Sequence, residues 1–280
     1  MRKYALAIHD LSCYGKCALS IVLPVLSAMD VETTPLPTAV LSTHTGGLGK
    51  PHVCDLTNDL LPILHHWKTL KLSFGAVYSG YLASLEQLDI IQTFFEAYPD
   101  SLHFVDPVMG DHGRLYSSMD PAFPTYMKAL CQKADIVTPN MTEAYALLAM
   151  DYQEGPYTKK DIADIVFALR KLCQADIVLT GVYFDELTIG AAVLAKDDEE
   201  ITYIQHAKVA GAFHGTGDLF SSILLGALLH KKALAKAVDI AAKVTAMCIK
   251  KSNEEQEDER KGLHFEFVLH QLYDEMQRED

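Results

Sequence analysis

The sequence predicts an α/β fold in which a mainly parallel sheet carries helices on both faces. The chain has 280 residues, of which 49% are hydrophobic and 22% charged, as in ordinary globular proteins. Short apolar runs alternate along it with longer segments of helical period. This alternation is typical of parallel sheets, whose crossover helices cover the sheet. No internal repeat or second-domain boundary is evident, so we expect a single domain over residues 1–280.

The amino-terminal half begins with a buried strand expected at Tyr4–Ile8. A helix is expected at Cys17–Met29, where Pro24 would kink it or shift its start. Val31–Leu41 is expected to be extended, and its prolines Pro35 and Pro37 favour a place at a sheet edge. The remaining expected elements of this half are helices at Asp55–Leu70 and Leu85–Tyr98 and strands at Ala76–Tyr78 and Leu102–Val105.

The carboxy-terminal half continues the alternation. Expected strands are Ile136–Val137 and Ile177–Leu179, and expected helices are Thr142–Met150 and Lys159–Cys173. Thr188–Leu194 and Ile201–His206 are expected to pair as a hairpin. Two long helices, Thr216–Leu229 and Ala233–Lys251, then lead through an acidic connector around Glu254–Glu259 to a last helix that contains Phe267 and Met276.

Charge and cysteine content limit the possible functions. Lys and Arg number 24 against 37 Asp and Glu, a net charge of −13, which argues against nucleic-acid binding by bulk electrostatics. An anionic substrate would need local neutralisation by a metal ion or by backbone amides. The six cysteines form no CxxC pair, and no apolar stretch is long enough for a signal peptide or a membrane span. We therefore expect a cytoplasmic protein without nucleic-acid or membrane partners.

Polar residues gather where the predicted strands end. Asp10, Asp106, Asn140 and Thr180 each follow a predicted strand. Ligands of open parallel sheets bind beyond the carboxyl ends of the strands. These residues are therefore candidates for a binding site.

The most specific motif is Gly215-Thr216-Gly217-Asp218 at the start of a strongly apolar helix. Glycines let the backbone turn so that its amides converge, and a helix N-terminus adds further N–H groups, so the motif can bind phosphate oxygens. A carboxylate beside such a pocket suits a base that takes a proton from an attacking hydroxyl. The alternative is a simple helix cap made by Thr216 or Asp218.

The motif resembles the catalytic signature of the ribokinase-like kinases. Asp-Pro-Val-Met-Gly-Asp at 106–111 and Asn-Met-Thr-Glu at 140–143 resemble further motifs of the vitamin kinases in that superfamily. Ser-Thr-His-Thr-Gly at 42–46 and Ser-Gly-Tyr-Leu at 79–82 resemble substrate-side segments of pyridoxal kinases. These matches occur in family order along essentially the whole chain. The chain is therefore similar to bacterial pyridoxal (pyridoxamine) kinases, which implies a ribokinase-like three-layer sandwich.

The resemblance implies an activity and its requirements. We expect ATP-dependent phosphorylation of the 5′-hydroxymethyl group of vitamin B6, with Mg²⁺ and, as known in the family, a monovalent cation such as K⁺. Asp218 would be the general base, and Gly215, Thr216 and Gly217 would form the anion hole. Asn140 and Glu143 would support Mg²⁺ through water, or else only cap a helix. A homodimer is expected by analogy.

Other residues take expected roles from the same resemblance. The nucleotide side would include Asp106, Asp111, Tyr116 and Thr180. The substrate side would include Asp10, Thr45 and Tyr81, with Tyr81 stacking on the ring. Each of these roles has a purely structural alternative. Aspartates at strand ends can simply bond neighbouring amides, and Tyr116 can be an ordinary surface tyrosine.

Two departures from the family pattern keep other functions open. Many relatives carry a Ser-His pair after the first strand, whereas this chain has His9-Asp10, and an aspartate there also resembles the hydroxymethylpyrimidine kinases. The stretch Gly15-Lys16-Cys17-Ala18 has a single glycine where a glycine-rich segment is expected. The alternatives are thus a hydroxymethylpyrimidine kinase and a non-catalytic B6-binding protein. An intact base motif and Asn140/Glu143 pair argue against the second, because storage needs neither.

Overall fold

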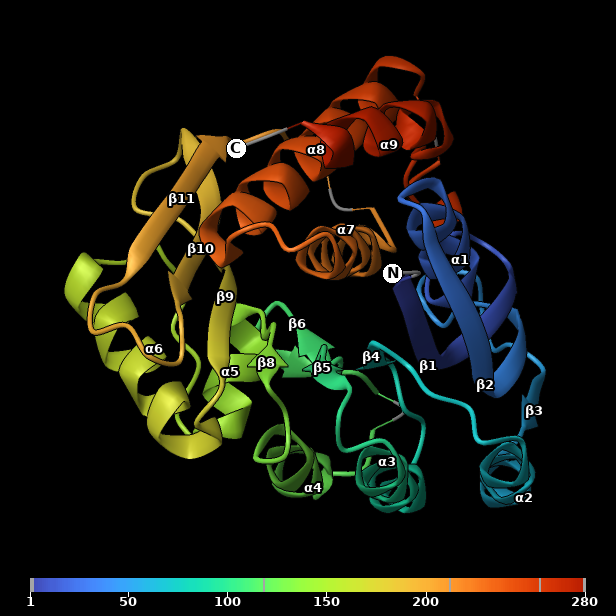
Figure 1. Ribbon diagram of the computed structural model, residues 1–280. Helices are drawn as coiled ribbons and strands as arrows, with labels where there is room; N and C mark the ends of the chain where they lie inside the picture. Colours follow the sequence, from blue (N-terminus) through green and yellow to red (C-terminus); the bar gives the residue numbers. More distant parts are fainter. Residues whose placement is uncertain (1–2, 118, 212, 257, 279–280) are drawn as a thin grey trace. The chain divides into compact units, whose positions relative to one another are not determined.

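The first and last parts of the chain together form one structural unit, and the middle part forms another (Figure 1). The computed structural model describes residues 3–117, 119–211, 213–256 and 258–278. The first unit comprises Met1–Ala76 and Val209–Asp280, and the second comprises Val77–Lys208. The predicted acidic connector around Glu254–Glu259 therefore lies partly outside the described residues, at position 257.

The elements of the first unit are close to those predicted. They are β1 (Lys3–Tyr14), α1 (Leu19–Ala28), β2 (Val31–Thr43), β3 (Val53–Asp55), α2 (Thr57–Leu70), α7 (Thr216–Leu229), α8 (Leu234–Glu254), the 3-10 turns η1 (Glu259–Lys261) and η2 (Glu266–Val268), and α9 (Leu269–Gln277). Helix α1 begins later than predicted, and Pro24 remains inside it. The strand order is β1-β2-β3.

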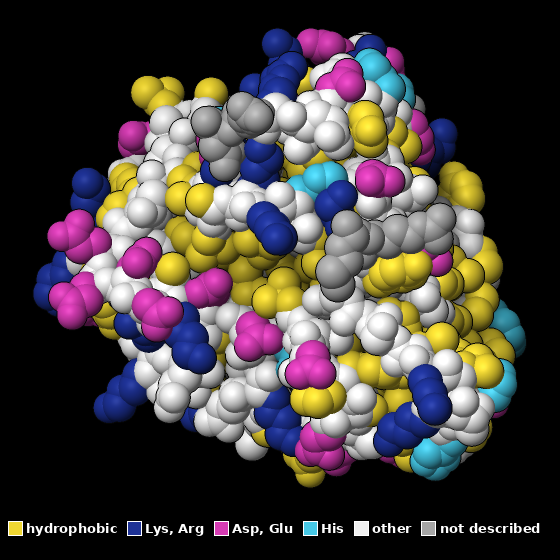
Figure 2. All heavy atoms as spheres, in the orientation of Figure 1, with side chains coloured by type: hydrophobic (Ala, Val, Ile, Leu, Met, Phe, Trp, Pro, Cys, Tyr) yellow, Lys and Arg dark blue, Asp and Glu magenta, His cyan; other side chains and the backbone are white. Residues whose placement is uncertain are grey.

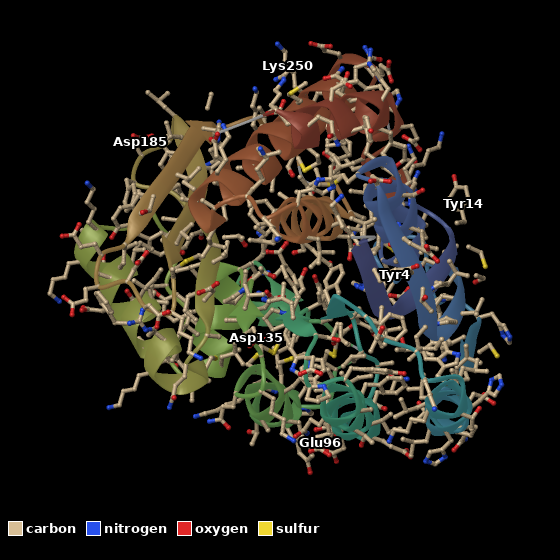
Figure 3. The ribbon with its side chains drawn as sticks, viewed as in Figure 1. Tyr4, Tyr14, Glu96, Asp135, Asp185 and Lys250 are labelled. Atoms are coloured by element: carbon tan, nitrogen blue, oxygen red, sulfur yellow. The ribbon has the colours of Figure 1, made fainter. Side chains whose placement is uncertain are left out.

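Strand β1 is longer than predicted because it continues past an irregularity. It runs parallel to β2, and the register between the two shifts between His9 and Leu11. Ala5–Ile8 are fully buried, as the apolar run predicts. The shift lets the strand continue as far as Tyr14, whose side chain is 50% exposed and points away from the ribbon in Figure 3.

The prolines of β2 were predicted to lie at an edge of the sheet, and only part of β2 has a strand on both sides. Pro35 and Pro37 are opposite Ala7 and His9 of β1. The antiparallel strand β3 contacts β2 only along Ala39–Leu41. The prolines therefore lie in the part of β2 that β3 does not cover, which suits residues that have no N–H to donate.

Helix α7 is the central helix of this unit. It packs against both α1 and α8, and α9 packs against α1 (Figure 1). Nine consecutive residues, Leu219–Ala227, are buried, as expected for a helix with neighbours on several sides. Gly226 lets the Met29 side chain pack closely against α7, because a Cβ at Gly226 would lie 2.4 Å from the terminal methyl carbon of Met29.

The second unit carries the middle of the predicted alternation. Strand β4 (Ala76–Ser79) leads into it, followed by α3 (Leu85–Ala97), β5 (Leu102–Val105), β6 (Gly110–Asp111), β7 (Arg114–Leu115), α4 (Phe123–Cys131), β8 (Ile136–Val137), α5 (Met141–Leu147), α6 (Lys159–Cys173), β9 (Asp176–Val182), β10 (Thr188–Leu194) and β11 (Thr202–Ala207). The strand order is β11-β10-β9-β8-β5-β4. The small hairpin of β6 and β7 was not predicted.

Pairing in this unit is parallel in the middle and antiparallel at one end. Strand β8 pairs in parallel with β5 and β9, and β10 and β11 form the predicted antiparallel hairpin. Helix α6 packs on β9 and β10, while α3 and α4 lie side by side (Figure 1). Tyr78 and Phe104 are fully buried and meet edge to face, with ring centroids 5.0 Å apart.

On the face drawn in Figure 2, Lys and Arg side chains are interspersed with Asp and Glu. Within the described parts of the chain, no helix is long and apolar enough to cross a membrane.

Candidate active site

The Gly-Thr-Gly-Asp motif forms the start of α7 in the first unit. Gly215 has a φ of +82° and caps the helix, and a Cβ at this position would lie 2.4 Å from the carbonyl oxygen of Lys16. Only glycine therefore fits here. The Thr216 hydroxyl donates to the carbonyl oxygen of Phe213 at 2.6 Å, so Thr216 would contribute its backbone N–H to an anion hole.

Asp218 lies in the first turn of α7 and is held by a neighbouring backbone amide. The N–H of Ala18 donates to its Oδ2 at 2.8 Å. Loss of hydration raises the pKa of Asp218, and the Ala18 hydrogen bond opposes that rise. A carboxylate that is oriented by one amide and poorly hydrated suits a general base. Ala18 was not predicted to take part, because a backbone donor leaves no signal in the residue type.

Asp10 differs in position from its prediction. It lies inside β1, beside the register shift at His9 and Leu11, instead of following the strand. Its side chain is buried, and the Ser12 hydroxyl donates to Oδ2 at 3.0 Å. Burial and the charge of Asp218 raise the pKa of Asp10 to about 7. Asp10 therefore binds a proton more readily than an ordinary aspartate, which the sequence alone predicts to be a carboxylate at neutral pH.

A third titratable group shares this environment. Burial and the charges of Asp218 and Asp10 raise the pKa of the Cys17 thiol. Cys17 is therefore a neutral thiol that lies near two carboxyl groups. The structure thus brings Asp10 and Asp218 within electrostatic reach of each other, as their proposed roles require.

In the segment at 42–46, which was predicted to lie on the substrate side, His44 bonds to two backbone groups. The N–H of Gly46 donates to Nδ1 of His44 at 3.0 Å, so the proton is on Nε2, which donates to the carbonyl oxygen of Arg260 at 2.6 Å. The ring of His214 lies against it, with centroids 4.4 Å apart. Thr45 is exposed beside this histidine. These contacts of His44 were not predicted from the sequence.

In the second unit, Asn140 and Glu143 form a reciprocal capping box at the start of α5. The Glu143 N–H donates to Asn140 Oδ1 at 2.9 Å, and the Asn140 N–H donates to Glu143 Oε2 at 2.8 Å. Asn140 Nδ2 donates to the carbonyl oxygen of Gly110 at 3.0 Å. The pair therefore makes the helix cap that was the alternative reading of this motif.

The cap also concentrates acidic groups. Glu143 is buried, its Oε1 accepts from the Met109 N–H at 3.2 Å, and burial together with the charges of Asp106 and Asp111 raises its pKa. Asp106 is also buried, whereas Asp111 is exposed. The described residues contain no cluster of three or more His, Cys, Asp or Glu able to hold a metal directly. Glu143 and Asp106 are thus buried acidic groups close to the start of α5.

The other predicted nucleotide-side residues lie in the same unit. Thr180 lies inside β9 instead of following its strand, and it forms an isolated parallel bridge with Asn140. Tyr116 follows β7, is 38% exposed, and donates its N–H to the carbonyl oxygen of Met109 at 3.0 Å. Tyr81 is half-buried in the segment before α3. Thr180, Asn140 and Glu143 are thus grouped around the start of α5.

Comparison with known proteins places the chain in a family. Residues 23–261 match the phosphomethylpyrimidine kinase family. The chain belongs to this family. Within it, the chain is 33% identical to the pyridoxal kinase of Lactobacillus plantarum, with a TM-score of 0.90 and 100% of both chains covered.

Two further relatives agree with this assignment. A Bacteroides thetaiotaomicron protein, provisionally named a phosphomethylpyrimidine kinase and crystallised with pyridoxal, is 34% identical with a TM-score of 0.92; the match covers 97% of this chain and 96% of that one. The pyridoxal kinase of Dictyostelium discoideum is 26% identical over 242 residues, which are 81% of this chain and 78% of that protein. The predicted resemblance to pyridoxal kinases and the predicted ribokinase-like α/β fold are confirmed.

Proposed function

We propose that this chain is an ATP-dependent kinase for the 5′-hydroxymethyl group of vitamin B6, which it converts to pyridoxal 5′-phosphate or its analogues. The observation that carries the proposal is the Asp218 carboxylate, which lies in the first turn of a glycine-capped helix and is oriented by the Ala18 amide at 2.8 Å. The full-length similarity to the Lactobacillus plantarum pyridoxal kinase supports the same activity.

Asp218 acts as the general base in this proposal. It takes the proton of the hydroxymethyl group while the hydroxyl oxygen bonds to the γ-phosphorus of ATP and ADP leaves. The N–H groups of Gly215, Thr216 and Gly217 stabilise the transferred phosphoryl group. These donors suit an acidic chain, because they offer positive potential without a cationic side chain.

Mg²⁺ neutralises the ATP phosphates when it is bound. Glu143 and Asn140 support its hydration shell, since each of their oxygen atoms accepts one backbone N–H and keeps a second lone pair for water. Asp106, Asp111, Tyr116 and Thr180 take the nucleotide side. A monovalent cation such as K⁺ belongs to the proposal as a further activator, without assigned ligands.

Asp10, Thr45 and Tyr81 take the substrate side. Because the pKa of Asp10 is raised to about 7, Asp10 can donate a proton to a hydrogen bond when neutral or accept one when ionised. A cationic ring nitrogen or amine would favour the ionised form. This residue therefore responds to the charge of the vitamer.

The proposal extends to the whole chain. We propose that residues 1–280 act as one kinase domain, because the Lactobacillus plantarum match covers 100% of both chains. A homodimer is proposed by analogy with the family. The six free cysteines favour a reducing compartment such as the cytoplasm.

A coupled ADP-release assay tests the proposed function. Purified protein with ATP and Mg²⁺ is given pyridoxal, pyridoxine, pyridoxamine or hydroxymethylpyrimidine in parallel reactions. We expect vitamer-dependent ADP release with at least one form of vitamin B6. A clear preference for hydroxymethylpyrimidine would support the other activity of this family, and binding of vitamers without ADP release would support a carrier.

A further inference from the structure

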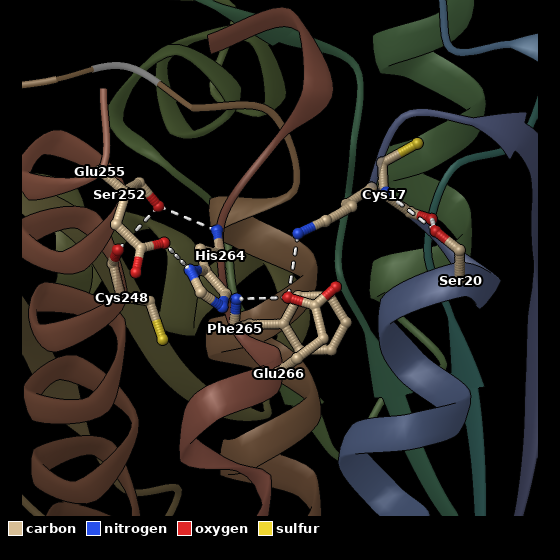
Figure 4. Close-up of polar contacts among 9 residues, drawn as sticks. Cys17, Ser20, Cys248, Ser252, Glu255, His264, Phe265 and Glu266 are labelled. Carbon is tan, nitrogen blue, oxygen red and sulfur yellow. Dashed lines mark hydrogen bonds and ion pairs between the residues drawn. The ribbon is translucent and has the colours of Figure 1, made fainter. Parts of the chain in front are cut away.

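The segment that follows α8, residues 258–266, lies against the loop that precedes α1; we call it the C-terminal strap. The Lys16 N–H donates to the carbonyl oxygen of Lys261 at 2.9 Å. Lys16 Nζ pairs with Glu266 Oε2 at 2.9 Å and lies 5.7 Å from the centre of the Phe265 ring (Figure 4). One residue thus meets the strap through both its backbone and its side chain.

The strap is in turn fixed to α8. Ser252 Oγ accepts from the His264 N–H at 2.8 Å and donates to the carbonyl oxygen of Cys248 at 2.9 Å. His264 Nδ1 also contacts Glu255 near the end of α8 (Figure 4). The strap is therefore attached at one end to a long helix of the unit.

Two glycines leave no spare room around Lys16. A Cβ at Gly262 would lie 2.6 Å from the carbonyl oxygen of Lys16 and 3.0 Å from that of His214. A Cβ at Gly215 would lie 2.4 Å from the same Lys16 oxygen. The Lys16 carbonyl therefore packs between Gly262 of the strap and Gly215, the first residue of the phosphate-binding motif, so a side chain at position 262 would have to displace it.

The same loop holds the proposed base. Two residues after Lys16, the Ala18 N–H meets Asp218 Oδ2 at 2.8 Å. Ala18 has a φ of +49°, a conformation that a residue with a Cβ rarely adopts. The direction of this N–H, and with it the direction of the carboxylate, therefore depends on the path of residues 16–18.

We infer that the C-terminal strap is a positioning device for Asp218, and that Lys16, Glu266 and Gly262 are its positioning residues. They act through the path of the 16–18 loop, which aims the Ala18 N–H at the carboxylate. The strap also reaches the substrate side, because the Arg260 carbonyl accepts from His44 Nε2 at 2.6 Å. The inference rests on the proposed kinase function, since it assigns a role to residues that act on the base.

Two glycine variants provide the first test. Gly262→Ala places a methyl group against the Lys16 carbonyl. Gly49→Ala is the matched control, because Gly49 has a similar φ of +82° but no heavy atom within 4 Å of its Cβ. A misplaced catalytic group loses about a hundredfold in rate for a displacement of ~1 Å. We expect kcat to fall about ten- to a hundredfold in Gly262→Ala, with the KM for ATP unchanged, while Gly49→Ala keeps its kcat.

A second set of variants tests the ion pair and does not depend on whether Gly262→Ala folds. An exposed ion pair changes an equilibrium by at most about fivefold, so Lys16→Met and Glu266→Gln should each lose about three- to fivefold in kcat. The reversed pair, Lys16→Glu with Glu266→Lys, should recover most of that loss. Glu96→Gln, which breaks an ion pair with Lys133 at 2.8 Å in the second unit, should keep its kcat.

The outcomes separate the two proposals. An active wild-type protein whose ion-pair variants all keep kcat within twofold would overturn the positioning role and leave the kinase function intact. A reversed pair no better than the single variants would overturn it as well. A wild-type protein that releases no ADP with any vitamer would overturn both.

Discussion

The raised pKa of Asp10 predicts that this residue destabilises the folded protein at neutral pH. Its side chain is buried, and its pKa rises from 3.8 to about 7 because of burial and the charge of Asp218. The native state therefore binds a proton on Asp10 more tightly than the unfolded state does. Stability from this group is complete below pH 4 and is lost as the pH rises towards 7. Asp10→Asn keeps an acceptor for Ser12 and removes the charge.

The size of the effect follows from the two pKa values. The shift lowers the free energy of unfolding by about 4 kcal/mol at pH 8 and by roughly 1.5 kcal/mol at pH 5, since each pKa unit corresponds to about 1.4 kcal/mol. Asp10→Asn should therefore have a higher free energy of unfolding than wild type, and this gain should be larger at pH 8 than at pH 5. We expect the gain at pH 8 to exceed the gain at pH 5 by up to roughly 2.5 kcal/mol.

Urea unfolding at pH 5 and pH 8 measures this difference. Trp67 is the single tryptophan of the chain and lies in α2, in the same unit as Asp10, so its fluorescence reports on the relevant transition. Asp258→Asn is the control. Arg260 lowers the pKa of Asp258 to about 2, so the loss of stability in that variant should be the same at both pH values. An advantage of Asp10→Asn that does not change with pH would refute the reasoning.

Three further predictions concern activity. Asp218→Asn should fold and keep its affinity for ATP but lose about 10²- to 10⁴-fold in kcat; a near-normal kcat would exclude Asp218 as the base. Glu143→Gln cannot accept from both the Met109 and Asn140 amides, so a Mg²⁺ titration should show a higher requirement while the vitamer KM changes less; an unchanged titration would leave Glu143 as a helix cap alone. Asp10→Ser should lower kcat/KM most for pyridoxamine and hydroxymethylpyrimidine, by about ten- to a hundredfold, and least for pyridoxal. Equal losses across a vitamer panel would show that Asp10 supports β1 and does not recognise the ring.

Much of the fold could be predicted from hydrophobic period alone. The helices α6 and α7 and the strands β5, β8 and β10 begin and end at the predicted residues. Strand β1 is the clearest failure, because the apolar run ends at Ile8 and the mixed residues that follow, His-Asp-Leu-Ser-Cys-Tyr, do not indicate that the strand continues past a register shift. The hairpin of β6 and β7 was missed because residues 110–115, Gly-Asp-His-Gly-Arg-Leu, contain no apolar run.

The candidate site was predictable in its side chains and not in its backbone. The Gly-Thr-Gly-Asp motif identified Asp218 because glycines before a carboxylate are informative residue types. The amide of Ala18, which orients that carboxylate, belongs to a residue whose side chain reveals nothing. The raised pKa of Asp10 was not predictable either, because it depends first on burial and then on the charge of Asp218, 208 positions away in the sequence.

The two prolines of β2 also affect how copies of this protein can associate. An unpaired strand edge normally invites a strand from another molecule, which continues the hydrogen-bonded ladder. Along the stretch of β2 that β3 leaves uncovered, Pro35 and Pro37 offer no N–H at alternate positions. Intermolecular strand addition at this edge would therefore lose donors twice within three residues. The proposed homodimer should therefore form without strand pairing at this edge. The prolines should also disfavour polymerisation by strand addition along the same stretch.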